Sequence, residues 1–148
     1  MGSQKPKTIS IDPGVNHCGI AVFEEKTLKY AKLIENDSMI TKAIVAEEKD
    51  SPIGAIEVPQ VYRVSKGDPN DLINVALAAG AHSASFETVK FYRPREWKGN
   101  VPKDVMCRRI LGRLTEEEKT RIEYCKQKSL HHNILDAIGI GLFHIGRL

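Results

Sequence analysis

A strand–turn–strand pattern in residues 8–23, TISIDPGVNHCGIAVF, constrains the fold of this chain more than any other feature. Its first part alternates polar and apolar side chains, and its last part is rich in β-branched and apolar ones, as in two paired strands. The Pro-Gly step between them suits a turn, which needs a fixed φ followed by a permissive residue. Asp12 is therefore expected at the end of the first strand. One acid does not define a site, so the rest of the chain has to supply partners for Asp12.

The size and composition of the chain are those of a soluble globular protein. Its 148 residues suit one domain, and 41% of them are hydrophobic and 28% charged. No apolar run approaches the roughly 20 residues that span a bilayer, so we expect no membrane partner. Residues 1–7 lack the apolar core of a signal peptide and are expected to be disordered. Three cysteines without CxxC spacing favour a cytoplasmic, intracellular setting, and the net charge of +3 permits a nucleic-acid partner.

The remaining pattern predicts an α/β fold in a single domain, residues 1–148, with a five-stranded mixed sheet flanked by helices. Asp68 and Pro69 mark the start of one helix, which Gly80 is expected to end. A capping box that begins at Thr115 is expected to open another helix. The expected strands are residues 8–11, 19–23, 27–34, 53–58 and 85–92, and the expected helices are residues 38–48, 72–79, 104–113, 115–128 and 131–148.

Three acids stand in apolar surroundings on separate predicted elements. Asp12 ends the first strand, Glu57 interrupts an apolar strand, and Asp136 is embedded in the apolar last helix. Acids are almost never fully buried unless they are paired or bind a cation. Three such acids therefore suggest one shared cation site, and Mg²⁺ or Mn²⁺ is the cation that prefers all-oxygen ligands.

Each acid also has an interpretation without a metal. Asp12 can serve as a turn former, and Glu57 as a partly exposed acid on an edge strand. Glu87, in a more polar predicted strand, is a rival to Glu57. Asn133 can be a helix N-cap with Asp136 at the third helical position. The metal site is excluded only if all of these interpretations are correct at once, so we favour the metal site.

The geometry of the last helix suggests a fourth ligand. At about 100° per residue, Asn133 and His132 lie roughly 60° and 40° to either side of Asp136 on one helix face. Either side chain can join the acid at a metal ion, although His132 can also be an ordinary first-turn histidine. The sequence leaves this choice open.

The motifs that carry these acids resemble those of RuvC-type Holliday junction resolvases. Asp12-Pro13-Gly14 followed by GIAV resembles the opening motif of that family, Ile56-Glu57 its second acid, and the segment DAIGIG from Asp136 its closing motif. The three motifs occur in the same order as in the family and span nearly the whole chain. The resemblance therefore implies an RNase H-like fold. One departure is Asn133, because the family usually has Asp or His three residues before the last acid.

The resemblance implies a Mg²⁺-dependent endonuclease that resolves four-way DNA junctions as a homodimer, with symmetric nicks that leave 5′-phosphate and 3′-hydroxyl ends. Two Mg²⁺ ions (Mn²⁺ is an alternative), roughly 3.5–4 Å apart, would serve the in-line displacement. Asp12 would bridge the ions, with Glu57 on one side and Asp136 with Asn133 or His132 on the other. These five residues are the expected catalytic residues.

Basic residues near these motifs are candidates for phosphate contacts, which position DNA without recognising its sequence. The segment from Trp97 to Lys103 also resembles the basic segment of the family, and Trp97 itself is expected to be a core or interface anchor. The helix at residues 72–79 is our candidate for part of the dimer interface. The expected DNA-binding residues are Lys66, Lys98, Lys103, Arg108 and Arg109.

Other functions fit the sequence less well. Actin-like ATPases and sugar kinases also begin with an Asp-x-Gly hairpin, but their chains are far longer than this one. A related RNase H-like nuclease that acts on RNA or on branched DNA remains an alternative. So does a non-catalytic junction-binding protein, which Asn133 favours.

Overall fold

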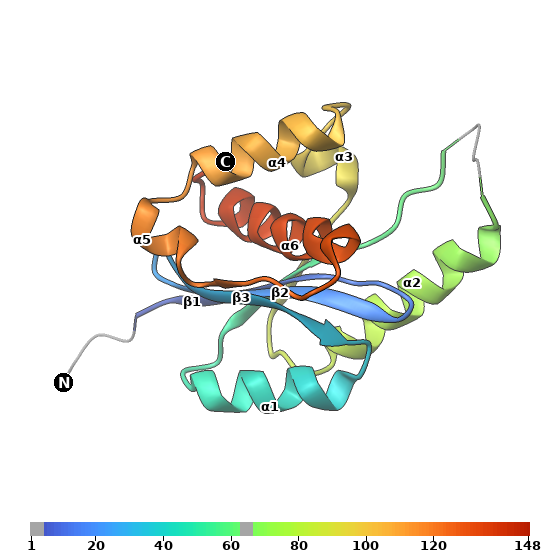
Figure 1. Ribbon diagram of the computed structural model, residues 1–148. Helices are drawn as coiled ribbons and strands as arrows, with labels where there is room; N and C mark the ends of the chain where they lie inside the picture. The colour runs from blue at the N-terminus through green and yellow to red at the C-terminus, as the bar shows by residue number, and fades with distance from the viewer. Residues whose placement is uncertain (1–4, 63–66) are drawn as a thin grey trace.

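The computed structural model describes residues 5–62 and 67–148, which form a mixed sheet with helices on both faces (Figure 1). The six strands lie in the order β5-β4-β1-β2-β3-β6. Their bounds are β1 Lys7–Asp12, β2 His17–Glu24, β3 Thr27–Glu35, β4 Ile53–Glu57, β5 Val89–Tyr92 and β6 Ile122–Glu123. The helices are α1 Ser38–Glu48, α2 Pro69–Ser83, α3 Pro94–Trp97, α4 Lys103–Gly112, α5 Glu116–Lys119, the 3₁₀ turn η1 Lys128–Leu130 and α6 His131–His144.

The strand register brings two of the three acids to one edge of the sheet. β1 and β2 are antiparallel, and Asp12 pairs with Gly19. β1 and β4 are parallel, and their last paired residues are Ile11 and Ile56. Asp12 and Glu57 are the next residues on these two strands. They therefore lie side by side where the carboxyl ends of the parallel strands meet.

The two faces of the sheet carry different helices. In Figure 1, α6 covers one face and α4 lies over α6, whereas α1 and α2 lie on the opposite side of the sheet. Residues 134–142 of α6 are all buried, which explains why this helix is apolar on every side. Asp136 is inside this buried stretch, so the fold itself places an acid in the core.

The sheet has six strands where the sequence predicts five. Residues 115–128 were expected to be one helix; this prediction is wrong, because α5 ends at Lys119 and β6 follows it. The predicted capping box is present, with Thr115 and Glu118 bonded reciprocally. However, the Glu118 carboxylate also accepts hydrogen bonds from the Leu28 amide and from Arg147, which holds this short helix against β3. The chain then pairs with the edge of β3, a tertiary contact that helix propensity does not predict.

Other element boundaries also differ from the prediction. Helix α2 continues through Gly80 to Ser83, because buried His82 anchors its last turn with hydrogen bonds that outweigh the cost of about 1 kcal/mol for a helical glycine. Residues 85–88 are a turn and not strand, and β5 begins only at Val89.

At the two ends of the chain the boundaries differ as well. Lys7, which was expected to be disordered, is the first residue of β1. The last helix was expected to run from residue 131 to 148, but α6 ends at His144.

Candidate active site

Asp12 lies at the end of β1 beneath the first turn of α6. Asp12 pairs with Gly19 on β2. A side chain at position 19 would clash with α6, because its Cβ would lie 1.9 Å from the carbonyl oxygen of Asn133. The glycine thus lets α6 approach the sheet beside Asp12. Asp12 is only 8% exposed. A residue that only forms a turn would be expected at the surface, so this burial argues against that interpretation of Asp12.

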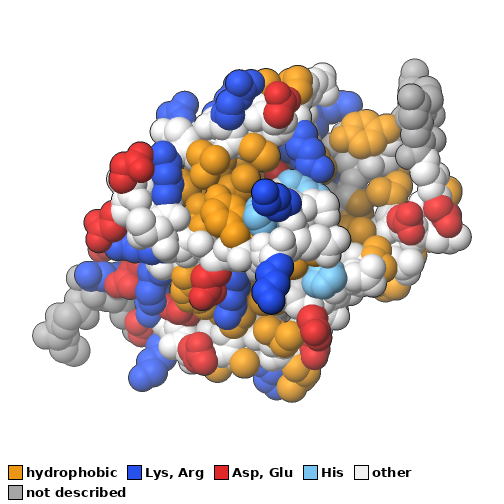
Figure 2. Space-filling model, in the orientation of Figure 1, with side chains coloured by type: hydrophobic (Ala, Val, Ile, Leu, Met, Phe, Trp, Pro, Cys, Tyr) orange, Lys and Arg blue, Asp and Glu red, His pale blue; other side chains and the backbone are white. Residues whose placement is uncertain are grey.

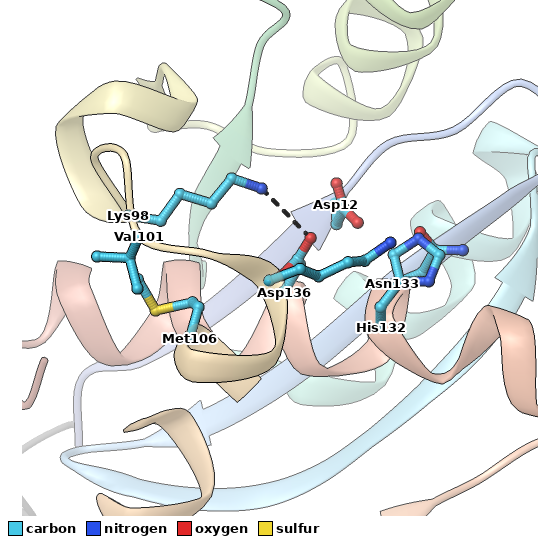
Figure 3. Close-up of a pocket in the computed structure, with 8 residues that line it drawn as sticks. Asp12, Lys98, Val101, Met106, His132, Asn133 and Asp136 are labelled. Atoms are coloured by element: carbon cyan, nitrogen blue, oxygen red, sulfur yellow. Dashed lines mark ion pairs between the residues drawn. The ribbon is translucent and has the colours of Figure 1, made fainter. Parts of the chain in front are cut away.

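Helix α6 brings the second acid to the same place. The Ser10 hydroxyl donates a hydrogen bond of 2.6 Å to the carbonyl oxygen of Ala137 and fixes the helix on β1. Asp136, one residue earlier, is 9% exposed. It lines a cavity of about 400 Å³ together with Asp12, and both carboxylates point toward it (Figure 3).

Glu57 lies at the end of β4, next to Asp12 in the sheet. Its Oε2 accepts a hydrogen bond of 2.5 Å from the indole Nε1 of Trp97. Trp97 is the last residue of α3 and is 5% exposed. The expectation that Trp97 anchors the core is confirmed, but sequence patterns gave no sign of its contact with Glu57. Glu87, the rival acid, is exposed and lies in the turn before β5.

Lys98, which the sequence suggested as a phosphate contact, reaches into the acid cluster. Its Nζ lies 3.5 Å from Oδ2 of Asp136, as the dashed line in Figure 3 shows. Burial opposes the charge of Lys98, but the carboxylates of Asp136, Glu57 and Asp12 outweigh it and raise the lysine pKa. One ammonium group thus faces three carboxylates.

In all three acids, burial and the repulsion between like charges outweigh the effect of the nearby cations. Burial raises the pKa of Asp12 well above its ordinary value, and the charges of Glu57 and Asp136 raise it further. Burial likewise raises the pKa of Glu57 and of Asp136, against the opposing effect of Lys98. Such shifts are typical of functional sites, where like charges are held together.

Both candidates for a fourth ligand line the cavity. Asn133 is the third residue of α6, whose N-cap is Leu130, so the alternative in which Asn133 caps the helix is wrong. His132 Nδ1 lies 2.8 Å from the carbonyl oxygen of Ser129 and donates to it. This bond fixes the tautomer and leaves the Nε2 lone pair available, as in many metal-binding histidines.

The other basic candidates lie at different distances from the acids. Lys103 lines the cavity, and its charge lowers the pKa of Asp12 and Asp136. Arg108 and Arg109 are exposed on α4, where Arg108 pairs with Asp104 at 3.7 Å. Figure 2 shows several Lys and Arg side chains along α3 and α4. Lys66 lies outside the described residues.

The donor set fits a hard divalent cation in its chemistry. Carboxylate and amide oxygens and one imidazole line the cavity from β1 and α6. Glu57, on β4, is not among the lining residues, but its charge acts on Asp12. Oxygen ligands are those that Mg²⁺ and Mn²⁺ prefer. Among residues 5–62 and 67–148, no three His, Cys, Asp or Glu side chains are already drawn into one coordination shell.

A mixed sheet of this order, with acids at the ends of β1 and β4 and on the last helix, is an RNase H-like fold. The structure is similar to that of Thermus thermophilus RuvC, with 15% sequence identity and a TM-score of 0.64 over 93% of this chain and 92% of that chain. It is also similar to T. thermophilus RuvC in complex with a Holliday junction substrate, with 19% identity and a TM-score of 0.65 over 94% and 92% of the two chains. No protein-family model and no curated protein matches the sequence. The resemblance to RuvC that the three motifs indicated is thus confirmed in the fold.

Proposed function

We propose that this protein is a divalent-metal-dependent endonuclease that resolves four-way DNA junctions. The observation that carries the proposal is the convergence of Asp12, Glu57 and Asp136 at one edge of a RuvC-like sheet, with raised pKa values and too few cations to balance them. A structural neighbour bound to a Holliday junction supports the choice of DNA substrate.

The three acids, with His132 or Asn133, would hold Mg²⁺ or Mn²⁺, as two ions per site. When bound, such ions would supply an activated water molecule and charge neutralisation at the leaving 3′-oxygen, the chemistry that gives 5′-phosphate and 3′-hydroxyl ends. The contribution of the chain is to hold the carboxylates at buried positions, where electrostatic interactions are strong. Asp12, which lies near both Glu57 and Asp136, is the acid that we expect to contribute most to holding the ions.

The cations beside the acids would bind the DNA backbone. Lys98 and Lys103 lie at the cavity, and Arg108 and Arg109 continue the positive charge along α4. Lys and Arg contacts to phosphates position a nucleic acid and make its binding sensitive to salt. Lys66, which is not among the described residues, remains a prediction of the same kind.

Symmetric resolution requires two active sites, so we propose a homodimer with two-fold symmetry. Helix α2 is the candidate surface. Ile73 and Leu77 lie one helical turn apart on it and are 57% and 66% exposed. Figure 2 shows hydrophobic side chains along this helix, and such residues are unfavourable on a surface that stays in water.

The test offers the purified protein a synthetic four-way junction, a linear duplex and an RNA–DNA hybrid, each with Mg²⁺, with Mn²⁺ or with a chelator. We expect paired, symmetric nicks in the junction alone, and only with a divalent ion. Equal cleavage of the linear duplex, or cleavage in the chelator, would contradict the proposal. Preference for the hybrid would favour a nuclease that acts on RNA, and junction binding without cleavage would favour a non-catalytic binding protein.

A further inference from the structure

The indole of Trp97 contacts one of the three acids through its only polar atom. Its Nε1 donates to Glu57 Oε2 at 2.5 Å, and the two residues are 40 positions apart in the sequence. Indole N–H is a donor only, so a carboxylate is a natural partner for it in a buried place. The contact joins the end of β4 to the end of α3.

The ring of Trp97 is held rigidly enough to orient its partner. It packs on α6 at Gly139, where an added Cβ would lie 2.5 Å from the ring carbon Cζ3. The side chain is 5% exposed and belongs to the main core cluster. A buried aromatic ring with fixed neighbours gives its N–H a fixed direction, so the hydrogen bond holds the carboxylate of Glu57 in one orientation.

The type of donor matters as much as its position. Lys98, the next residue, approaches Asp136 with a positive charge that competes with a metal ion for the carboxylate. Trp97 is neutral, so it satisfies one oxygen of Glu57 without adding a competing charge. Within the described part of the chain, Oε1 of Glu57 has no hydrogen-bond or ion-pair partner, so this oxygen stays available.

We propose that Trp97 is a positioning residue of the metal site, which binds Oε2 of Glu57 so that Oε1 faces a divalent ion. Partners of this kind typically change metal affinity by about 10–100-fold when they are removed. The inference rests on the proposed function, because it requires that Glu57 binds a metal.

The substitution Trp97→Phe separates the hydrogen bond from the packing, because phenylalanine keeps an aromatic ring against α6 and lacks the N–H donor. We expect its affinity for Mn²⁺, measured by calorimetry at a temperature where the variant is fully folded, to fall about 10-fold or more. Binding of the four-way junction in chelator should stay unchanged. Thr41→Val, which removes a buried hydrogen bond on the other face of the sheet, is the matched control and should keep its Mn²⁺ affinity.

A double-mutant cycle with Glu57→Gln gives the sharper test, since two residues that act through one contact are not additive. We expect Trp97→Phe to cost little further Mn²⁺ affinity once Glu57 is changed. Full additivity would overturn the proposal, and so would wild-type affinity in Trp97→Phe. If the unaltered protein itself binds no Mn²⁺ and cleaves no junction, the proposed function fails and not the role of Trp97 alone.

The unaltered protein offers a second measurement that needs no variant of Trp97 to fold. Trp97 is the only tryptophan in the chain, so the tryptophan emission of the protein comes from the residue bonded to Glu57. We expect Mg²⁺, which does not quench fluorescence, to shift this emission in a saturable manner, and Glu57→Gln to abolish the shift. An emission that ignores Mg²⁺ while calorimetry detects binding would overturn the proposal.

Discussion

Two clusters of buried polar side chains lie on opposite faces of the same sheet, and they differ in how far their polar groups are satisfied. On the face of α1 and α2, His82 is fully buried, and its Nδ1 accepts from the Thr41 hydroxyl at 2.7 Å while its Nε2 donates to Asn36 Oδ1 at 3.0 Å. Burial lowers the pKa of His82 and raises that of the nearby Cys18 thiol to about 11, so both stay neutral. On the face of α6, three acids lie close to one another, and Lys98 and Lys103 offset their charge only in part.

The difference is the one expected between a structural cluster and the proposed metal site. The neutral groups around His82 complete one another, which stabilises the packing of α1 and α2 and requires no ligand. The acids repel one another, and their burial without enough cations costs free energy of folding. A protein tolerates such a conflict where a ligand resolves it, and here that ligand would be a divalent cation.

The largest expected effect follows from removing the charge at the centre of the acid cluster. Asp12→Asn should lower junction cleavage by at least about 100-fold, because a metal site supplies several kcal/mol of stabilisation to the reaction. The same variant should raise the free energy of unfolding of the metal-free protein, because one of the repelling charges is gone. Single-turnover cleavage and urea unfolding measure the two effects. If Asp12→Asn cleaves at the rate of the unaltered protein, or is markedly less stable, the acid cluster does not differ from the His82 cluster in the way proposed.

The fourth ligand is tested by changing the two neighbours on α6. We expect His132→Ala to lower the affinity for Mn²⁺ by about 10–100-fold and to do so more than Asn133→Ala, because the bond from Nδ1 to Ser129 already orients the imidazole. His131→Ala is the control, since the Nε2 of that residue is bonded to the carbonyl oxygen of Cys125 and not to the cavity. A larger loss in Asn133→Ala would assign the ligand to the amide.

The other cluster should respond in stability alone. Thr41→Val keeps the shape of the side chain but leaves Nδ1 of His82 without its partner, which should cost about 2 kcal/mol of unfolding free energy. Urea unfolding checks the loss, and cleavage measured on the folded protein should not change. A fall in cleavage per folded molecule would mean that the two faces are coupled.

The smallest expected effect is the pH dependence of the metal-free protein. The pKa values of Asp12, Glu57 and Asp136 are higher in the folded protein than in the unfolded chain. Between the folded and the unfolded pKa values, the folded state therefore binds more protons than the unfolded state. The stability of the metal-free protein should therefore rise as pH is lowered from neutrality toward the ordinary carboxylate range. Saturating Mg²⁺ should flatten this rise, and a stability that falls across the same window without metal would contradict the assignment.

The sequence predicted those parts of the site that interrupt an apolar pattern. Asp12, Glu57 and Asp136 could be found because an acid is conspicuous in a buried strand or helix. The bond from Trp97 to Glu57 could not be predicted, because it depends on how α3 folds back onto the sheet. The position of Lys98 escaped prediction for the same reason, since a lysine in a basic segment is usually a surface residue.

The fold was predictable to a similar extent. The hairpin of β1 and β2, the following strand and the first and last helices are signalled by local patterns of side chains. Strand β6 has only two residues, and it exists because the edge of β3 is available to pair with it. Local propensity contains no information about such a contact.

Calorimetric titration of Mn²⁺ into the metal-free protein tests the central claim, that the acid cluster is a site for divalent cations. The unaltered protein and Thr41→Val should bind Mn²⁺ in a saturable manner with the same affinity. Asp12→Asn and Asp136→Asn should bind at least about 10-fold more weakly, because each loses a charged ligand. Equal binding in all four proteins, or none in the unaltered protein, would contradict the account.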